Sequence, residues 1–160
     1  MLGILRTVVV NKKGTEMKRF IVENDFTHCG LRCVVLLQNA GHRCGYVGVP
    51  QGHNLFCQTA DFDVVETLEV HGGITYSGGG IESYYPVESD LWWFGFDCAH
   101  YMDLNDFDAA LKAFDDPETQ RSLLSHKYIC EQYPDRFGVV RTLDYCIEQC
   151  KHLAEQLKEN

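Results

Sequence analysis

The run at residues 91–103, LWWFGFDCAHYMD, constrains the fold of this chain more than any other stretch. Its first six residues are apolar and β-favouring, which predicts a buried strand that leads into a polar loop. Four aromatic side chains in the strand bury large areas and are interpreted as core: Trp92, Trp93, Phe94 and Phe96. Asp97, His100 and Asp103 follow where a rigid strand gives way to a loop, and polar functional groups collect at such places.

Two kinds of hydrophobic periodicity predict a mixed fold. Short apolar or alternating runs predict strands at residues 2–10, 16–22, 33–37, 46–49, 64–70 and 91–96. Apolar residues three and four apart predict a helix at 104–114, which the sequence DDP at 115–117 ends, and a helix from 139 to the C-terminus. Residues 118–133 look less regular and partly extended.

These elements predict a single α+β domain over residues 1–160. We expect a mostly antiparallel sheet with two or three helices, of which the amphipathic C-terminal helix packs on one face. The strand that ends at His71 and the strand at 91–96 are expected to pair, because consecutive strands usually do. Residues 1–16 form either a hairpin around the NKKG turn or a flexible extension.

Charge and composition exclude two classes of partner. The net charge of −9 argues against binding of duplex nucleic acid, because Lys and Arg on phosphates carry that affinity. No run approaches the roughly 18 apolar residues that a membrane span needs. Eight cysteines would suggest disulfides in a secreted protein, but the N-terminal segment does not read as a signal peptide. We therefore expect free thiols in a reducing cytoplasm. A homo-oligomer and a monomer are both compatible with the sequence.

Two glycine-rich blocks carry further histidines. Residues 40–53 place His42, Tyr46 and His53 among four glycines, and this density predicts a turn-rich surface where backbone can approach a ligand closely. The block does not match a phosphate-loop or dinucleotide fingerprint.

The second block, HGGITY at residues 71–76, places His71 at an expected strand end. Gly72 and Gly73 follow it, and their amides are candidate donors to an anion. Thr75 is a further candidate ligand contact. A turn that needs only the two glycines is the alternative interpretation.

Cysteine spacing raises two metal hypotheses. His28, Cys29 and Cys33 suggest zinc, but no second close pair follows, so buried thiols are the preferred interpretation. The other hypothesis uses a subset of five residues: His71, Asp97, Cys98, His100 and Asp103. We assign no metal ligand and identify no cofactor.

Three motifs resemble those of a known group of proteins. GHRCGYVGVPQGH, HGGITY and WWFGFDCAHYMD occur in that order before a closing helix that contains YCIEQCKHLAEQL. They are similar to an uncharacterised family of small bacteriophage and prophage proteins with GYVGVP-x-GH, HGG-(I/L)-T and WW-x-GFDCAH patterns. The likeness covers residues 33–157 and implies a phage origin and a setting in the host-cell cytoplasm. It supplies no mechanism.

The histidines point to acid–base chemistry on a small nucleotide-like ligand, such as a cyclic dinucleotide or an NAD-derived immune signal. We expect His71 and His100 to act as acid and base, with Asp97 orienting an imidazole. The expected ligand contacts are His42, Tyr46, His53, Gly72, Gly73, Thr75, Trp93, Cys98 and Asp103. Cys98 as a covalent nucleophile is a weaker variant.

Three alternatives stay open: a sponge that sequesters the ligand without turnover, a metal-binding protein, and a structural or interaction protein. The nucleotide hypothesis requires the separate histidine segments to fold around one polar hollow.

Overall fold

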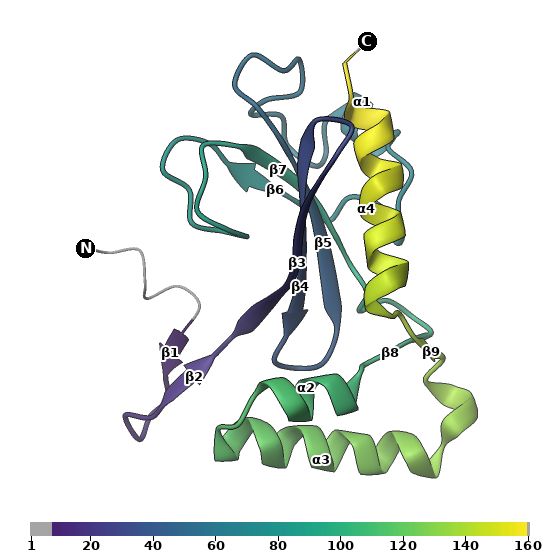
Figure 1. Ribbon diagram of the computed structural model, residues 1–160. Helices are drawn as coiled ribbons and strands as arrows, with labels where there is room; N and C mark the ends of the chain where they lie inside the picture. Colours follow the sequence, from purple (N-terminus) through teal and green to yellow (C-terminus); the bar gives the residue numbers. More distant parts are fainter. Residues whose placement is uncertain (1–7, 160) are drawn as a thin grey trace.

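The computed structural model describes residues 8–159, and a five-stranded antiparallel sheet lies at its centre (Figure 1). The strand order is β3-β4-β5-β7-β6. The bounds are β3 Phe20–His28, β4 Leu31–Gln38, β5 Arg43–Val49, β6 Tyr76–Gly79 and β7 Trp92–Asp97. The three central strands carry the apolar runs that the sequence marks as buried, so the core is built on both of their faces.

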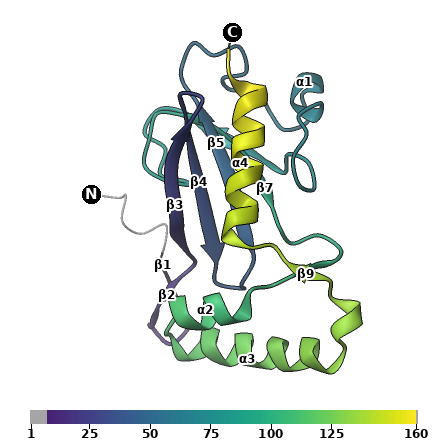
Figure 2. The same cartoon turned by 45° about the vertical axis from the view of Figure 1, so that its right-hand side comes forward.

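Helix α4, Leu143–Leu157, covers one face of the sheet and contacts β3, β4 and β5 (Figure 2). The helix begins at Thr142, whose hydroxyl accepts a hydrogen bond from the Tyr145 amide at 3.2 Å. Its buried residues recur three and four apart: Cys146, Cys150, Leu153, Ala154 and Leu157. This stripe confirms the predicted amphipathic helix on one face, and with it the α+β class.

The opposite face of the sheet is covered by residues 80–91. Tyr85 and Leu91 of this segment pack on Tyr46 and Trp93, which are both buried. The rings of Tyr46, Tyr76 and Tyr85 meet with centroids 5.4 to 5.5 Å apart, and the hydroxyls of Tyr46 and Tyr85 are hydrogen-bonded to each other. Tyr46 and Trp93 are therefore core side chains on the face away from α4, which corrects their assignment as ligand contacts.

Glycines in the central strands make room for aromatic rings. Gly45 of β5 lies opposite Phe96 of β7, and Gly95 of β7 lies opposite Tyr46. A Cβ on Gly45 would stand 2.4 Å from the Phe96 ring, and one on Gly95 would stand 2.5 Å from the Tyr46 ring. The glycine density expected to form a turn-rich ligand surface at 40–53 therefore serves packing inside a strand as well.

Two helices close one end of the sheet, below β4 and β5 in Figure 1. They are α2, Phe107–Ala113, and α3, Pro117–Gln132, and they enclose a small core with Leu37. The expectation of an irregular segment at 118–133 is wrong, because α3 is continuous. Asp116 caps it by accepting from the Thr119 amide at 2.9 Å, and Pro117 occupies the first helical position.

The remaining elements are short. They are β1 Val8–Val10, β2 Glu16–Lys18, α1 Asp63–Glu66, β8 Asp103–Leu104, the 3₁₀ turn η1 Pro134–Arg136 and β9 Val139–Val140. β1 and β2 pair as the expected hairpin, and residues 2–7 of the predicted first strand lie outside the described residues.

One predicted strand, one strand pairing and one helix boundary are corrected. Helix α1 and a turn replace the strand expected at 64–70, so the antiparallel neighbour of β7 is β6 and not a strand that ends at His71. β9 pairs in parallel with β8, which removes residues 139 and 140 from the predicted C-terminal helix.

Among residues 8–159, no helix combines the length and the apolar character needed to cross a membrane.

Candidate functional site

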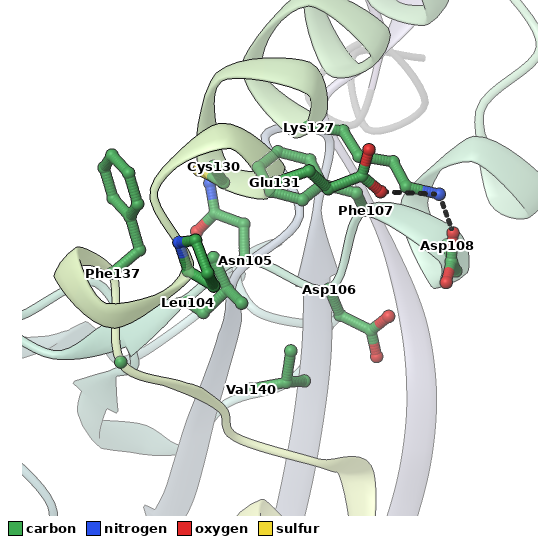
Figure 3. A pocket seen from close by; sticks show the side chains of 12 residues that line it. Leu104, Asn105, Asp106, Phe107, Asp108, Lys127, Cys130, Glu131, Phe137 and Val140 are labelled. Atoms are coloured by element: carbon green, nitrogen blue, oxygen red, sulfur yellow. Dashed lines mark hydrogen bonds and ion pairs between the residues drawn. The ribbon is translucent and has the colours of Figure 1, made fainter.

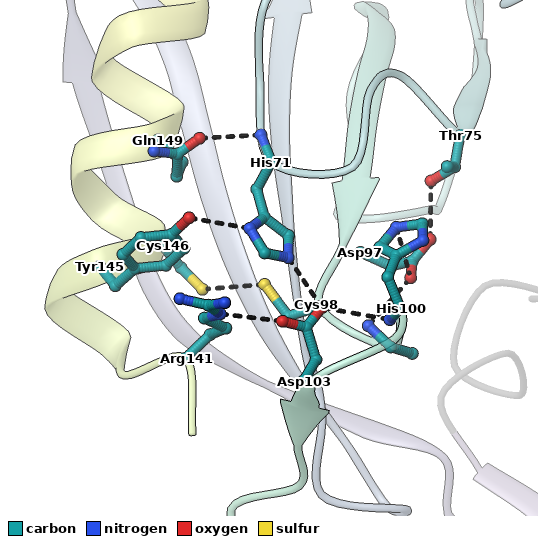
Figure 4. Close-up of polar contacts among 11 residues, drawn as sticks. His71, Thr75, Asp97, Cys98, His100, Asp103, Arg141, Tyr145, Cys146 and Gln149 are labelled. Carbon is teal, nitrogen blue, oxygen red and sulfur yellow. Dashed lines mark hydrogen bonds and ion pairs between the residues drawn. The ribbon is translucent and has the colours of Figure 1, made fainter. Parts of the chain in front are cut away.

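His71 lies on the connection between α1 and β6, and its ring faces the first turns of α4 (Figure 4). Its Nδ1 is 2.8 Å from the hydroxyl of Tyr145, and its Nε2 is 2.7 Å from Oδ2 of Asp103. Its backbone amide donates to Oε1 of Gln149 at 2.8 Å. The side chain is 12% exposed. A largely buried imidazole thus stands between a carboxylate and a hydroxyl, the order of groups found in proton-relay triads.

Asp103 connects His71 to two other polar groups. Its side chain is 1% exposed, its Oδ1 accepts from Nε of Arg141 at 2.8 Å, and its Oδ2 accepts from the His100 amide at 3.1 Å. Burial by itself raises the pKa of Asp103, but the hydrogen bonds from Arg141, His71 and the His100 amide outweigh it and leave the pKa below its ordinary value. The carboxylate is therefore charged at neutral pH.

Tyr145 completes the relay from helix α4. The guanidinium of Arg141 lies 5.2 Å from the centre of its ring. Burial raises the pKa of the hydroxyl, so Tyr145 is protonated at neutral pH. Because the Asp103 carboxylate only accepts, Nε2 of His71 donates to it, and Nδ1 of the neutral ring accepts from the Tyr145 hydroxyl.

His100 and Asp97 form a second pair beside the first. Nε2 of His100 is 3.3 Å from Oδ1 of Asp97, and the Thr75 hydroxyl donates to Oδ2 of the same carboxylate at 2.8 Å. The His100 side chain is 37% exposed, although its Nε2 is shielded from solvent. In residues 8–159 this nitrogen is the one buried side-chain polar atom without a hydrogen-bond partner. His100 is therefore the less constrained imidazole of the two.

The two imidazoles are close neighbours, with ring centroids 5.9 Å apart. Gly72 makes this approach possible, because a Cβ at this position would stand 2.3 Å from Nε2 of His100. Its φ of +68° is also in the region that glycine adopts without strain. The structure thus brings together five of the predicted site residues with Gly72: His71, Thr75, Asp97, His100 and Asp103.

The other two predicted histidines differ in their surroundings. His42 is half-buried, and burial lowers its pKa while the negative charge of Asp97 opposes that shift, which places it near the second pair. His53 is buried, accepts from the Leu55 amide at 3.0 Å and donates to the Leu157 carbonyl at 2.7 Å. Leu157 is twelve residues after Tyr145, or about 18 Å along α4. The expected common hollow therefore excludes His53.

Two further expectations are corrected by local contacts. The amide of Gly73 donates to the Val70 carbonyl at 2.9 Å, so it is not free to bind an anion. Cys98 is 2% exposed and its sulfur is 3.7 Å from that of Cys146. This contact and burial raise the pKa of the Cys98 thiol, so Cys98 is neither an activated nucleophile nor an accessible ligand contact.

Sequence reasoning missed three residues of the site: Arg141, Tyr145 and Gln149. Tyr145 and Gln149 are four residues apart and so share one side of α4, and Arg141 lies four residues before Tyr145, just ahead of the helix. Figure 4 shows all three on the side that faces His71. That spacing is the signal that could have found them. Which residues these three side chains contact, however, depends on how α4 packs on the sheet.

A groove lies next to the site, between α2, α3 and β9 (Figure 3). It has a volume of about 380 Å³, and an adjoining hollow of about 240 Å³ extends it to Asp103. Phe107, Cys130 and Phe137 line both. His71 and His100 line neither cavity, so the groove lies beside the histidine pairs and does not include them.

Comparison of the chain with protein-family models, with curated proteins and with solved structures gives no match.

Proposed function

We propose that this chain is a phage-type cytoplasmic protein that binds a small nucleotide-like ligand and hydrolyses it by proton transfer at His71 and His100. The observation that carries the proposal is the pair of carboxylate-backed imidazoles with centroids 5.9 Å apart. Hydrolysis of a phosphodiester needs one group to accept a proton and another to donate one, and two adjacent imidazoles can divide these tasks at neutral pH.

The two pairs have different roles in this proposal. His100 is 37% exposed and acts on the ligand directly, with Asp97 behind it. His71 is 12% exposed and acts through the Tyr145 hydroxyl, while Asp103 stabilises the imidazolium that forms. A ribose 2′-hydroxyl of the ligand attacks the neighbouring phosphorus as its proton passes to Tyr145 and the Tyr145 proton passes to His71. The bond between the phosphorus and the 5′-oxygen breaks, and that oxygen leaves with a proton from His100. Water then opens the 2′,3′-cyclic phosphate to complete the hydrolysis.

A sequestering protein is the second candidate. It is favoured by the observation that both ring nitrogens of His71 are already hydrogen-bonded, which is a fixed and not a mobile arrangement. Such a protein would use the same residues to hold the ligand intact.

The test is incubation of the purified full chain with a panel of labelled cyclic dinucleotides and NAD-derived signals, followed by denaturation and separation of the nucleotides. We expect a new product from one member of the panel, with turnover reduced by about 100-fold or more in His100→Ala. His152→Ala is the matched control, because His152 is an exposed histidine on α4 that belongs neither to the two pairs nor to the lining of the groove. Its turnover should equal that of the parent.

The outcomes separate the candidates. Stoichiometric recovery of intact ligand identifies a sponge. Neither product nor retained ligand with any member of the panel contradicts both candidates. His71→Ala removes two hydrogen bonds inside the fold, so its activity is compared only after circular dichroism shows parent-like structure, whereas His100→Ala removes none from its ring nitrogens.

A further inference from the structure

A second group of ligand-type side chains lies where the β3–β4 turn meets the C-terminal half of α4. His28 is the last residue of β3, Cys29 is the first residue of the turn, and Glu155 is in the last turn of the helix. In Figures 1 and 2 the turn lies beside the upper part of α4. Nε2 of His28 is 3.0 Å from Oε1 of Glu155, although the residues are 127 positions apart.

The three side chains present three different donor atoms. One nitrogen of His28, the sulfur of Cys29 and one carboxylate oxygen of Glu155 all lie within 4.8 Å of one another. Ligands of tetrahedral zinc stand about 3.3 to 3.8 Å apart, given bond lengths of about 2.0 to 2.3 Å. Small side-chain rotations are enough to bring the three donor atoms from their present spacing to that of zinc ligands, because none of the three side chains is packed in the core.

The backbone of the turn presents the thiol. Cys29 and Gly30 have φ angles of +52° and +76°, as in the tight two-residue turns that match the twist of paired strands. The first of these positions is commonly Asn, Asp or Gly, and here it carries an exposed cysteine. Cys33 does not take part, because it is fully buried and its thiol donates to the Leu31 carbonyl.

We propose that His28, Cys29 and Glu155 bind a zinc-like divalent cation, with water in the fourth position. The combination of imidazole, thiolate and carboxylate is one that zinc accepts, whereas magnesium and calcium prefer oxygen donors alone. The cation replaces the hydrogen bond between His28 and Glu155 and fastens the β3–β4 turn to α4. Glu155 is ten residues after Tyr145, about 15 Å along the helix, so this site is separate from the His71 site.

The experiment is a titration of the chelator-treated full chain with Co²⁺, followed by optical absorption, and with Zn²⁺, followed by calorimetry. We expect one cation per chain and a thiolate-to-cobalt charge-transfer band in the near ultraviolet. Cys29→Ser should abolish the band, and His28→Asn and Glu155→Gln should each weaken affinity about tenfold or more. These side chains are exposed or half-exposed, so the variants keep the fold.

Cys57→Ser is the matched control. Cys57 is also exposed and also has a positive φ, +65°, but it belongs to no cluster of ligand-type side chains in residues 8–159. The control should keep the band and the affinity of the parent. Absence of the band and of stoichiometric Zn²⁺ binding in the parent overturns the proposal, and so does a band that survives Cys29→Ser.

Discussion

Asp103 is the residue on which the histidine site depends most. Its carboxylate holds His71 and Arg141 through its two oxygens and is almost fully buried. We expect Asp103→Asn to lower the free energy of unfolding by about 3 kcal/mol, because loss of one partner leaves a cation without its counter-charge. Urea unfolding at pH 7 measures this change.

Asp108→Asn is the comparison for Asp103→Asn. Asp108 also pairs with a cation, Lys127, at 2.7 Å, but its side chain is 82% exposed. Solvent screens such a pair, so the loss should be under about 1 kcal/mol. Equal losses for the two variants would show that Asp103 is no more than a surface charge.

Asp97 and His100 were predictable because they lie at and after the end of the apolar run that forms β7. His71 also follows an apolar run, but that run forms α1 and a turn instead of the expected strand. His53 has the same local signal, yet it caps its own turn and the end of α4. Neighbouring residues cannot reveal this difference. The partners of His53 and His71 on α4 are 104 and 74 positions away along the chain, and the packing of α4 brings them together.

β5, β7 and α4 pack closely against one another at Gly45. A Cβ there would stand 2.4 Å from the Phe96 ring and 2.7 Å from the Cys150 sulfur. We expect Gly45→Ala to lower the free energy of unfolding by about 2 to 3 kcal/mol, because the ring and the helix have to move apart. Thermal unfolding followed by circular dichroism measures the loss.

Gly78→Ala is the matched control for Gly45→Ala. Gly78 is also a strand glycine, in β6, but the added Cβ would meet only the hydroxyl end of Tyr76, at 2.7 Å. That ring can turn, so the loss should be clearly smaller. A loss as large as that of Gly45→Ala would contradict the packing explanation.

The elements with a clear hydrophobic pattern in the sequence were predictable, and those without one were missed. β4 is a continuous apolar run that is buried on both faces, and the buried positions of α4 recur at the helical period. In α3, by contrast, Thr119 and Leu123 are the buried residues, while Leu124, Tyr128 and Ile129 are exposed. With so few buried positions, α3 shows no apolar stripe in the sequence. The residues that begin it, Asp116 and Pro117, also look like the end of the helix before it.

The whole molecule should lose stability in two steps as the pH falls. Burial lowers the pKa of His42, so the unfolded chain binds the proton more readily, and stability present above pH 6.5 or so declines below it. Asp103 also has a lowered pKa, so its contribution is complete above about pH 4 and is lost as the pH falls through the folded-state pKa. Urea midpoints measured between pH 8 and pH 3 follow both steps.

His42→Gln distinguishes the first step from the second. The variant cannot take up a proton at position 42, so the decline between pH 7 and pH 5.5 should be reduced while the decline below pH 4 stays. An unchanged profile would mean that His42 keeps its ordinary affinity for protons in the folded chain.

Helix α4 contacts the His71 loop near its beginning and the β3–β4 turn near its end. One helix thus takes part in both sites, so a ligand at either end acts on a shared element. Any free energy by which it changes binding at the opposite end is matched by an equal change in the reverse direction.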